Sequence, residues 1–195
     1  LHLLYPFVPI RSPAAGKLGF DRKEGEMNYY TSDWHFFHKQ IIKYCNRPYA
    51  SEKAMRNAII SDFNSVVRKD DTAFVIGDAA MLGSSQWEAL KAVMGKLNGT
   101  KHLIFGNHDE FRWQRYIDIG FTSVHSSLWL QEDGFNIVLA HDPNVYSRLE
   151  PETILLCGHV HTLFKSLPDA RVVNVGIDQW RYPVNFDQIR KELNL

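Results

Sequence analysis

Residues 101–109 read KHLIFGNHD, a strand-like run that ends in a glycine followed by three polar residues. An amide, an imidazole and a carboxylate thus stand side by side in Asn107, His108 and Asp109. Gly106 is expected to permit the sharp turn that directs these neighbours to different tasks. A polar loop after a strand is also ordinary turn chemistry, so the meaning of this stretch depends on what the other strand ends carry.

The same order of strand, polar end and helix recurs through the first half of the chain. Strands are expected at 28–31, 72–76 and 101–105. Helices are expected at 38–45, at 51–67 with Ser51 as N-cap, from a capping box at 85–88 through Leu97, and at 110–119. Such alternation predicts an α/β fold, in which functional groups gather at the carboxyl ends of strands.

After Gly120 the pattern becomes rich in extended segments. Strands are expected at 121–130, 135–140, 153–157 and 172–175, with a turn at 132–134. An amide version of a capping box, formed by Asn185 and Gln188, is expected to begin a last helix at 186–195. Residues 27–195 are expected to form one domain, and residues 1–26 an N-terminal extension that is either flexible or foreign to it.

The composition fits an ordinary globular domain. The 195 residues are 45% hydrophobic and 13% aromatic, which supports a full core. Lys+Arg and Asp+Glu balance at 22 each, so no global basic field indicates a nucleic-acid partner, although a local patch is compatible with this balance. No stretch approaches the ~18 apolar residues of a spanning helix, so no membrane partner is expected. Cys45 and Cys157 lie far apart and are expected to be reduced, buried thiols, which favours the cytoplasm.

Groups able to bind a metal ion follow most of the expected strands. In chain order the strand ends supply Asp33, His35, Asp78, Asn107, His108, His141, His159 and His161. Imidazoles with carboxylates and one amide, without thiolate, suit Mn, Fe, Zn, Co or Ni better than Mg or Ca alone. The alternate pairs Asp33/His35 and His159/His161 are expected to project to the same side of an extended segment, so each pair can reach one site.

This ordered series resembles the motifs of the calcineurin-like metallophosphoesterases. The motifs are Asp33-x-His35, Gly77-Asp78, GNHD at 106–109, His141 and Gly158-His159-Val160-His161. The resemblance covers residues 28 to about 185, and the NRP sequence at 46–48 is similar to that of small bacterial and phage-type members. It implies a two-sheet β-sandwich flanked by helices, arranged in four layers as α/β/β/α.

The resemblance also implies a dinuclear metal site. It places Asp33, His35, Asp78 and His161 on one ion, and Asp78, Asn107, His141 and His159 on the other, so that Asp78 bridges the two. Manganese is the favoured metal, with Fe, Zn, Co and Ni as alternatives. The implied reaction is hydrolysis of a phosphodiester or phosphomonoester by a metal-bridging hydroxide. His108 would donate a proton or contact the transition state at the leaving group, with Asp109 fixing its tautomer.

The chain departs from the common family pattern at two places. Residues 79–82, AAML, follow Gly77-Asp78 where many members carry an acid and an arginine, and Asp142-Pro143 follows His141. The first departure removes groups that contact phosphate. Arg47 could replace them through its planar fork, but a surface or salt-bridge role is the favoured interpretation. His38 is expected to be either a substrate contact or a solvent-accessible histidine at a helix start.

Other polar and aromatic residues have simpler expected roles. Trp34, Phe36 and Phe37 are expected in the core, with stacking on a base as the alternative. His102 and His125 are expected to pack within strands or face solvent, and not to be functional. Three polar residues are expected either to orient ligating histidines or to cap turns: Asp142, Asn174 and Asp178.

Three functional hypotheses stay open at this point. The first is an enzyme that acts on a small phosphoester such as a nucleotide. The second is a catalytically silent metal-binding scaffold that recruits proteins. The chain has His108 as well as every expected metal ligand, which argues against this hypothesis. The third is a metal-dependent nuclease, which the neutral charge disfavours because duplex binding depends on many phosphate contacts. The oligomeric state is left open.

Overall fold

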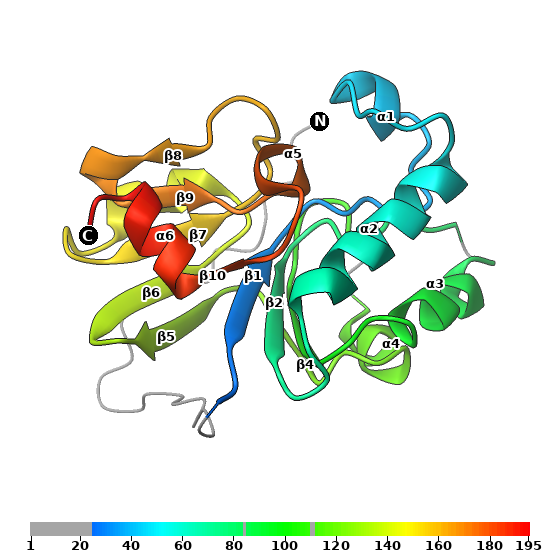
Figure 1. Cartoon of the computed structure of the whole chain (residues 1–195), viewed down its shortest axis with the longest axis horizontal. Helices are drawn as coiled ribbons and strands as arrows, with labels where there is room; N and C mark the ends of the chain where they lie inside the picture. Colours follow the sequence, from blue (N-terminus) through cyan, green and yellow to red (C-terminus); the bar gives the residue numbers. More distant parts are fainter. Residues whose placement is uncertain (1–24, 84, 110–111) are drawn as a thin grey trace.

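The computed structural model describes residues 25–83, 85–109 and 112–195. It contains two five-stranded sheets that face one another, with helices packed outside them (Figure 1). The expected extension at 1–26 lies, up to residue 24, outside the described residues. Within the described ranges, no helix is long and apolar enough to cross a membrane.

The first sheet has the strand order β10-β1-β2-β3-β4. Its strands are β1 (Asn28–Thr31), β2 (Thr72–Ile76), β3 (Thr100–Ile104), β4 (Ser123–His125) and β10 (Val184–Asn185). Strands β1 to β4 are mutually parallel, and β10 pairs antiparallel with β1. A nearly continuous apolar run, as in β2, is typical of a parallel strand that is covered on both faces. The carboxyl ends of β1, β2 and β3 therefore lie at the same edge.

The second sheet has the strand order β5-β6-β7-β9-β8. Its strands are β5 (Leu128–Glu132), β6 (Phe135–Leu139), β7 (Ile154–Cys157), β8 (Ser166–Leu167) and β9 (Val172–Asn174). Its three central strands are parallel, and the two edge strands are antiparallel to their neighbours. Asp133 and Gly134, between β5 and β6, have φ values of 49° and 84°, which suits a type I′ hairpin turn. The expected turn at 132–134 is therefore confirmed.

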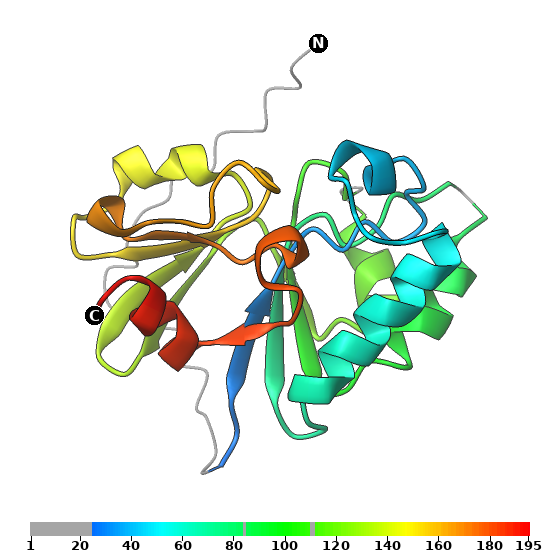
Figure 2. The ribbon, with the colours of Figure 1, turned by 45° about the horizontal axis from the view of Figure 1, so that its top comes forward.

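Helices cover the two outer faces unequally. The first sheet is covered by α1 (Ile41–Tyr44), α2 (Glu52–Val66), α3 (Trp87–Met94) and α4 (Trp113–Asp118), as Figure 2 shows. The second half of the chain contributes the 3-10 helices η1 (Pro143–Arg148) and η2 (Pro168–Ala170) and the short helices α5 (Ile177–Trp180) and α6 (Phe186–Glu192). The expected α/β sandwich is confirmed, but among the described residues a 3-10 helix, η1, packs on the outer face of the second sheet in place of a long α-helix.

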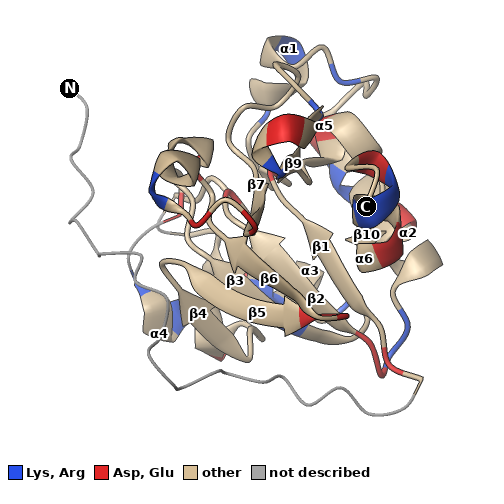
Figure 3. Ribbon diagram, turned by 90° about the vertical axis from the view of Figure 1, so that its left-hand side faces the viewer, with Lys and Arg blue, Asp and Glu red and all other residues tan. Residues whose placement is uncertain are grey.

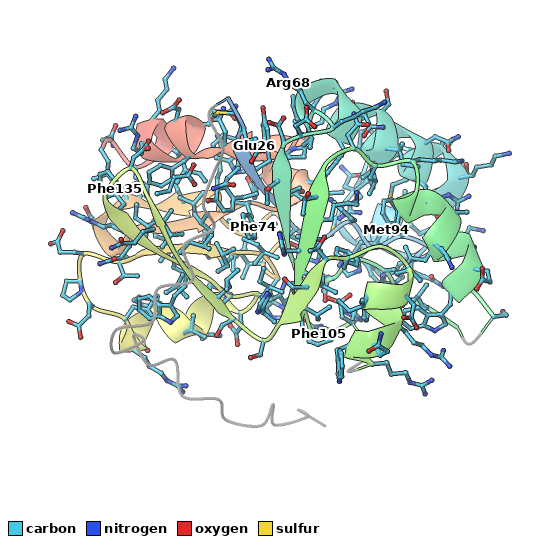
Figure 4. All side chains as sticks on the ribbon, turned by 90° about the horizontal axis from the view of Figure 1, so that it is seen from below. Glu26, Arg68, Phe74, Met94, Phe105 and Phe135 are labelled. Atoms are coloured by element: carbon cyan, nitrogen blue, oxygen red, sulfur yellow. The ribbon has the colours of Figure 1, made fainter. Side chains whose placement is uncertain are left out.

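Two large apolar clusters hold these layers together. One lies between the first sheet and its helices and includes Trp34, Phe63 and Met94. The other lies between the sheets and includes Phe74 and α6; Figure 4 shows Phe74 and Met94 on opposite sides of the first sheet. Charged residues concentrate on helices and loops, whereas the strands are almost free of them (Figure 3). Hydrophobic burial therefore fixes the layers and leaves the polar groups at the strand ends.

Several helix starts follow directly from local sequence. Ser51 accepts a hydrogen bond from the Ala54 backbone at 3.1 Å, and the capping box of Asn185 and Gln188 is present in both directions. The capping box expected at 85–88 is wrong. There α3 begins after Gln86, whose side chain accepts from the Gly83 backbone N–H at 2.8 Å. That side chain closes the preceding turn and cannot also cap the helix.

The expected single strand at 121–130 is also wrong. Its first part forms β4, which pairs with β3 in the first sheet, while its second part belongs to β5, which pairs with β6 in the second. An extended apolar pattern suits a strand in either sheet, so periodicity cannot reveal a crossing between sheets. The helix expected at 110–119 is seen as α4, which begins at Trp113 in the described residues.

Acidification is expected to lower the free energy of unfolding through His102. Its Nδ1 lies 2.6 Å from the Ser123 hydroxyl and its ring stacks on Phe74, in a buried position that confirms the expected packing role. Burial, with a smaller effect of His125, lowers the pKa of His102 from 6.5 to about 4. Between pH 6.5 and pH 4 the His102 ring binds a proton in the unfolded chain but not in the folded one. The free energy of unfolding therefore falls by roughly 1–3 kcal/mol as the pH decreases through this window.

Urea unfolding at pH 7 and pH 4.5 measures this loss. His102→Gln keeps a hydrogen-bonding group beside Ser123 but cannot titrate, and it serves as the control for every other ionisable group. The pH dependence of the variant is expected to be shallower. Equal pH dependence in both proteins would contradict the prediction.

Candidate metal centre

Loops from both sheets meet at one edge of the sandwich. Those of the first sheet follow β1, β2 and β3, and those of the second follow β6, β7 and β9. A parallel bridge between Ser32 and Gly176 joins the loops after β1 and β9. The imidazoles of His35 and His161 lie 5.2 Å apart between ring centroids, as do those of His141 and His159. Residues separated by more than a hundred positions thus share one site.

Asp78 lies between two histidines at this edge. Its Oδ2 is 3.4 Å from Nε2 of both His35 and His141, and its Oδ1 accepts a hydrogen bond from the His108 backbone at 2.9 Å. Burial would raise the pKa of Asp78, but the imidazoles of His141 and His35 lower it instead. Burial likewise would lower the pKa of His141, which Asp78 raises to about 9. The carboxylate is therefore ionised and can bind cations.

The imidazole of His35 fits a metal ion. Its Nε2 is buried and has no hydrogen-bond partner within the described part of the chain, a costly state for a polar atom. Burial lowers the pKa of His35 to about 3, so the ring is neutral, as a ligand requires. Donor atoms of Asp33, His35 and His161 lie within 4.8 Å of one another. A divalent ion among these atoms would satisfy the orphaned nitrogen.

A second group of donors includes Asp78 itself. Donor atoms of Asp33, Asp78 and His141 also lie within 4.8 Å of one another. The Asn107 Oδ1 is 3.1 Å from His141 Nε2 and 2.8 Å from His159 Nδ1. The structure thus brings together all seven residues expected to bind metal: Asp33, His35, Asp78, Asn107, His141, His159 and His161. Their assignment as ligands stays a prediction.

Unusual backbone conformations aim these side chains. Asp33, His35, Asp78, His159 and His161 all have positive φ, between 45° and 72°. This left-handed conformation is uncommon for residues other than glycine and costs energy, so its concentration points to a functional site. The expectation that alternate residues project from extended segments is wrong. Both pairs reach the site because their backbones turn, not because they lie in strands.

Outer partners orient three of the imidazoles. The Nδ1 of His141 is 2.8 Å from the Ile76 carbonyl, and that of His161 is 2.8 Å from Asp178 Oδ2. Such bonds on one ring nitrogen fix the tautomer that leaves the other nitrogen free for a metal. The His35 Nδ1 lies 3.3 Å from the Nδ1 of His38. His38 is buried here, so its expected solvent-accessible position at a helix start is wrong.

The structure distinguishes the two roles expected of Asp142, Asn174 and Asp178. Asp178 contacts His161, and the Asn174 amide donates to the backbone carbonyls of His161 and Phe164 at 2.8 and 3.0 Å. Both therefore support the loop after β7. The Asp142 side chain accepts from the Asn144 backbone at 2.9 Å and caps η1. Asp142 is thus a turn cap.

Asp109 does not serve His108 as expected. Its carboxylate accepts hydrogen bonds from the backbones of Asp78, Ala79 and Gly106 at 2.8, 3.1 and 2.9 Å, and from the Tyr116 hydroxyl at 3.4 Å. Four donors occupy its two oxygens, which leaves no good acceptor position for the His108 ring. Asp109 instead ties the loop after β3 to the loop after β2.

Asp109→Asn is expected to lower the free energy of unfolding of the metal-free protein by about 2–4 kcal/mol. An amide offers one acceptor oxygen, and its NH₂ group would face buried backbone N–H groups without partners. Urea unfolding measures the loss. Asp118→Asn is a matched control, because Asp118 is exposed and, in the described part of the chain, its side chain accepts a hydrogen bond from Gln114 alone. If Asp109→Asn were as stable as the control, the bracing role would be wrong.

Gly106 is needed for a different reason from the one expected. A Cβ atom there would lie 2.2 Å from Asp78 Oδ1 and 2.4 Å from its backbone nitrogen. Close approach of the two loops, and not a left-handed turn, therefore excludes a side chain. Gly77 combines both constraints, with φ of +83° and a Cβ position 2.3 Å from His141 Nδ1.

Cys45 was not connected with the site by sequence reasoning, and Arg47 was connected with it only as a possible phosphate contact. Cys45 is a half-buried free thiol whose sulfur lies within 4.8 Å of donor atoms of His161 and Asp178. Arg47 is buried and paired with Asp178, so the expected salt bridge is confirmed and the surface position is wrong. Only the NRP sequence signalled that Arg47 mattered.

Cys157 is free and buried, and Trp34 and Phe36 lie in the core, as expected.

Comparison with known proteins identifies the class. Residues 29–163 match the family model of the calcineurin-like phosphoesterases. This chain belongs to that family, whose general chemistry is metal-dependent phosphoester hydrolysis, and its site holds the clustered histidines and carboxylates that such chemistry needs.

Individual relatives are similar along most of the chain. An uncharacterized protein of Methanocaldococcus jannaschii is 30% identical over 169 residues, which covers 84% of this chain and 89% of that protein. The gene 66 protein of Mycobacterium phage D29 is 28% identical and covers 85% and 95%. A protein of unknown function from Aquifex aeolicus, AQ665, has a solved structure with a TM-score of 0.68 at 23% identity, covering 86% and 99%. That likeness supports the fold.

Proposed function

We propose that this chain hydrolyses a small phosphodiester or phosphomonoester with the help of two divalent ions. The observation that carries the proposal is Asp78, a buried carboxylate 3.4 Å from two histidines of different donor groups. Asp33, His35, Asp78 and His161 would hold one ion, and Asp78, Asn107, His141 and His159 the other. When bound, such ions would acidify the attacking water and neutralise charge on the phosphoryl oxygens.

His108 is the proposed proton donor to the leaving group. Its backbone N–H is fixed on Asp78 Oδ1, while its side chain is exposed at the mouth of the site. Its ring lies 5.2 Å from that of His35 and 5.9 Å from that of His38, between centroids. An exposed imidazole held beside the donor cluster can reach the oxygen that departs from phosphorus.

The rim of the site supports a substrate with a planar leaving group, such as a nucleotide. Large apolar side chains are exposed on segments that follow the donor motifs, namely Tyr44 at the end of α1 at 74%, Trp113 at the start of α4 at 61% and Leu163 after His161 at 78%. The Tyr44 ring stands edge-on to His38 with centroids 6.1 Å apart, next to His108. Exposed apolar groups that gather around one site indicate ligand contact more than single ones do.

A substrate panel tests this function. The full chain is stripped with a chelator, reloaded separately with Mn, Fe, Zn, Co or Ni, and assayed on aryl phosphomonoesters, aryl phosphodiesters, nucleotides and duplex DNA. Metal-dependent turnover, greatest with manganese and on small esters, is expected. Steeply salt-sensitive cleavage of duplex DNA would favour the nuclease instead. A protein that binds ions but hydrolyses none of these compounds would favour the protein-recruiting scaffold.

A further inference from the structure

Arg47 is a buried side chain whose hydrogen bonds all end on protein atoms. It lies in the loop after α1 and is only 6% exposed. Its Nε and Nη2 donate to the two oxygens of Asp178 at 2.7 and 2.8 Å. The planar guanidinium thus forms a bidentate pair with a carboxylate 131 positions away in sequence.

The remaining donors of Arg47 hold the loop after β1. Nη2 also donates to the Asp33 carbonyl at 2.8 Å, and Nη1 donates to the Trp34 carbonyl at 3.2 Å and the Met55 sulfur at 3.4 Å. These bonds account for all five N–H groups of an arginine. The side chain therefore has no donor left for a phosphate oxygen and cannot act as the phosphate clamp in this conformation.

Asp178 also contacts His161. The same carboxylate oxygen that accepts from Arg47 Nη2 lies 2.8 Å from His161 Nδ1. Arg47 is thus connected to two of the residues assigned above to one ion. It reaches His161 through Asp178, and it contacts Asp33 directly at the Asp33 backbone carbonyl. Both of these residues have positive φ, with values of 59° for Asp33 and 45° for His161, so their positions need support from neighbours.

We propose that Arg47 and Asp178 form a positioning pair that sets the imidazole of His161 and the loop of Asp33 in the geometry needed for one of the two metal ions. The effect of this pair on catalysis rests on the proposed function, whereas its effect on metal binding does not. Partners of metal-ligating histidines are known to change affinity or activity about 10–100-fold when they are replaced. Within the described part of the chain, no hydrogen bond joins the pair directly to Asn107, His141 or His159, which are assigned to the second ion.

The test compares Arg47→Lys, Asp178→Asn and the double variant. Lysine keeps the charge, but three donors on one nitrogen cannot replace the bidentate pair with Asp178 together with the bonds to the Asp33 and Trp34 carbonyls. Arg56→Lys is the matched control, because Arg56 is a half-buried arginine that pairs with Glu52 within α2 at 3.0 Å. Each protein is stripped of metal, its melting temperature is measured, and Mn²⁺ alone is titrated by calorimetry. Inhibition by inorganic phosphate and the values of kcat and KM are then measured.

If the pair has this role, Mn²⁺ affinity at one of two sites should weaken about 10–100-fold in both single variants. Mn²⁺ affinity at the other site, and at both sites of the control, should be unchanged. The double variant should lose little more than either single variant, because the residues act as a unit. kcat should fall and KM should change little. Mn²⁺ affinity equal to that of the unchanged protein would overturn the proposal, as would a phosphate inhibition constant that rises without any change in Mn²⁺ affinity.

Two further readouts keep the outcomes distinct. If Arg47→Lys does not fold, Asp178→Asn decides the question, since it retains the size of the side chain while it removes the charge and one of the two acceptor oxygens. If neither the variants nor the unchanged protein hydrolyse any ester, the proposed function fails. The Mn²⁺ titration still supports or overturns the positioning pair in that case.

Discussion

Asp78→Asn is expected to remove both metal ions and with them all measurable phosphoester hydrolysis. Asp78 is the carboxylate that lies 3.4 Å from one histidine of each donor group, and its ionised form is stabilised by His141 and His35. An asparagine of equal size keeps an oxygen for the His108 backbone N–H but has no charge. Replacing an outer partner of a ligand costs about 10–100-fold in affinity, so loss of a shared ligand is expected to exceed a hundredfold.

Calorimetric titration with Mn²⁺ and elemental analysis measure the effect of Asp78→Asn. Asp142→Asn is a suitable control, because Asp142 follows His141 directly but its carboxylate caps η1. The control should retain two ions and full activity. Retention of two ions by Asp78→Asn would show that the carboxylate does not bridge them.

His108→Ala is expected to lower kcat by about 10²–10⁴, the usual contribution of a general acid, while metal content and stability stay unchanged. The side chain is exposed and its ring contacts are with His35 and His38, so its removal leaves no buried cavity. The loss should be largest for alkyl esters, whose leaving group needs a proton. It should be small for nitrophenyl esters, whose leaving group departs as a stable anion.

The leaving-group dependence separates proton donation from other roles of His108. Equal losses for alkyl and nitrophenyl esters would indicate that the ring contacts the phosphoryl group instead. His125→Ala replaces a histidine of β4 whose ring lies against the Ser123 hydroxyl and which is not among the expected site residues, so kcat should not change. Unchanged turnover in His108→Ala would contradict the catalytic assignment of His108.

Strand positions and helix caps could be predicted from sequence because they depend on neighbours in the chain. Strand β1 and strand β2 have the bounds expected, and Ser51 and Asn185 cap the helices that follow them. The division of residues 121–130 between two sheets could not be predicted. Both parts have extended apolar patterns, and only their pairing with β3 and β6 distinguishes them.

The candidate site shows the same division between local and distant information. The sequence showed which donors follow which strands, and parallel strands necessarily place such ends at one edge. It did not show side-chain direction. Asp109 follows His108 directly but turns to the loop after β2, because four donors there satisfy its carboxylate better than one imidazole could.

For the stretch at 101–109, sequence by itself determined the strand, the glycine and the kinds of polar group that follow. Tertiary structure alone decided why residue 106 must be glycine, since the atoms that exclude a Cβ belong to Asp78. It also decided the pairing of Arg47 with Asp178, which are 131 positions apart. The physical reason is that chain connectivity constrains near neighbours, whereas the directions of buried polar groups depend on partners that only the packed layers bring within hydrogen-bond distance.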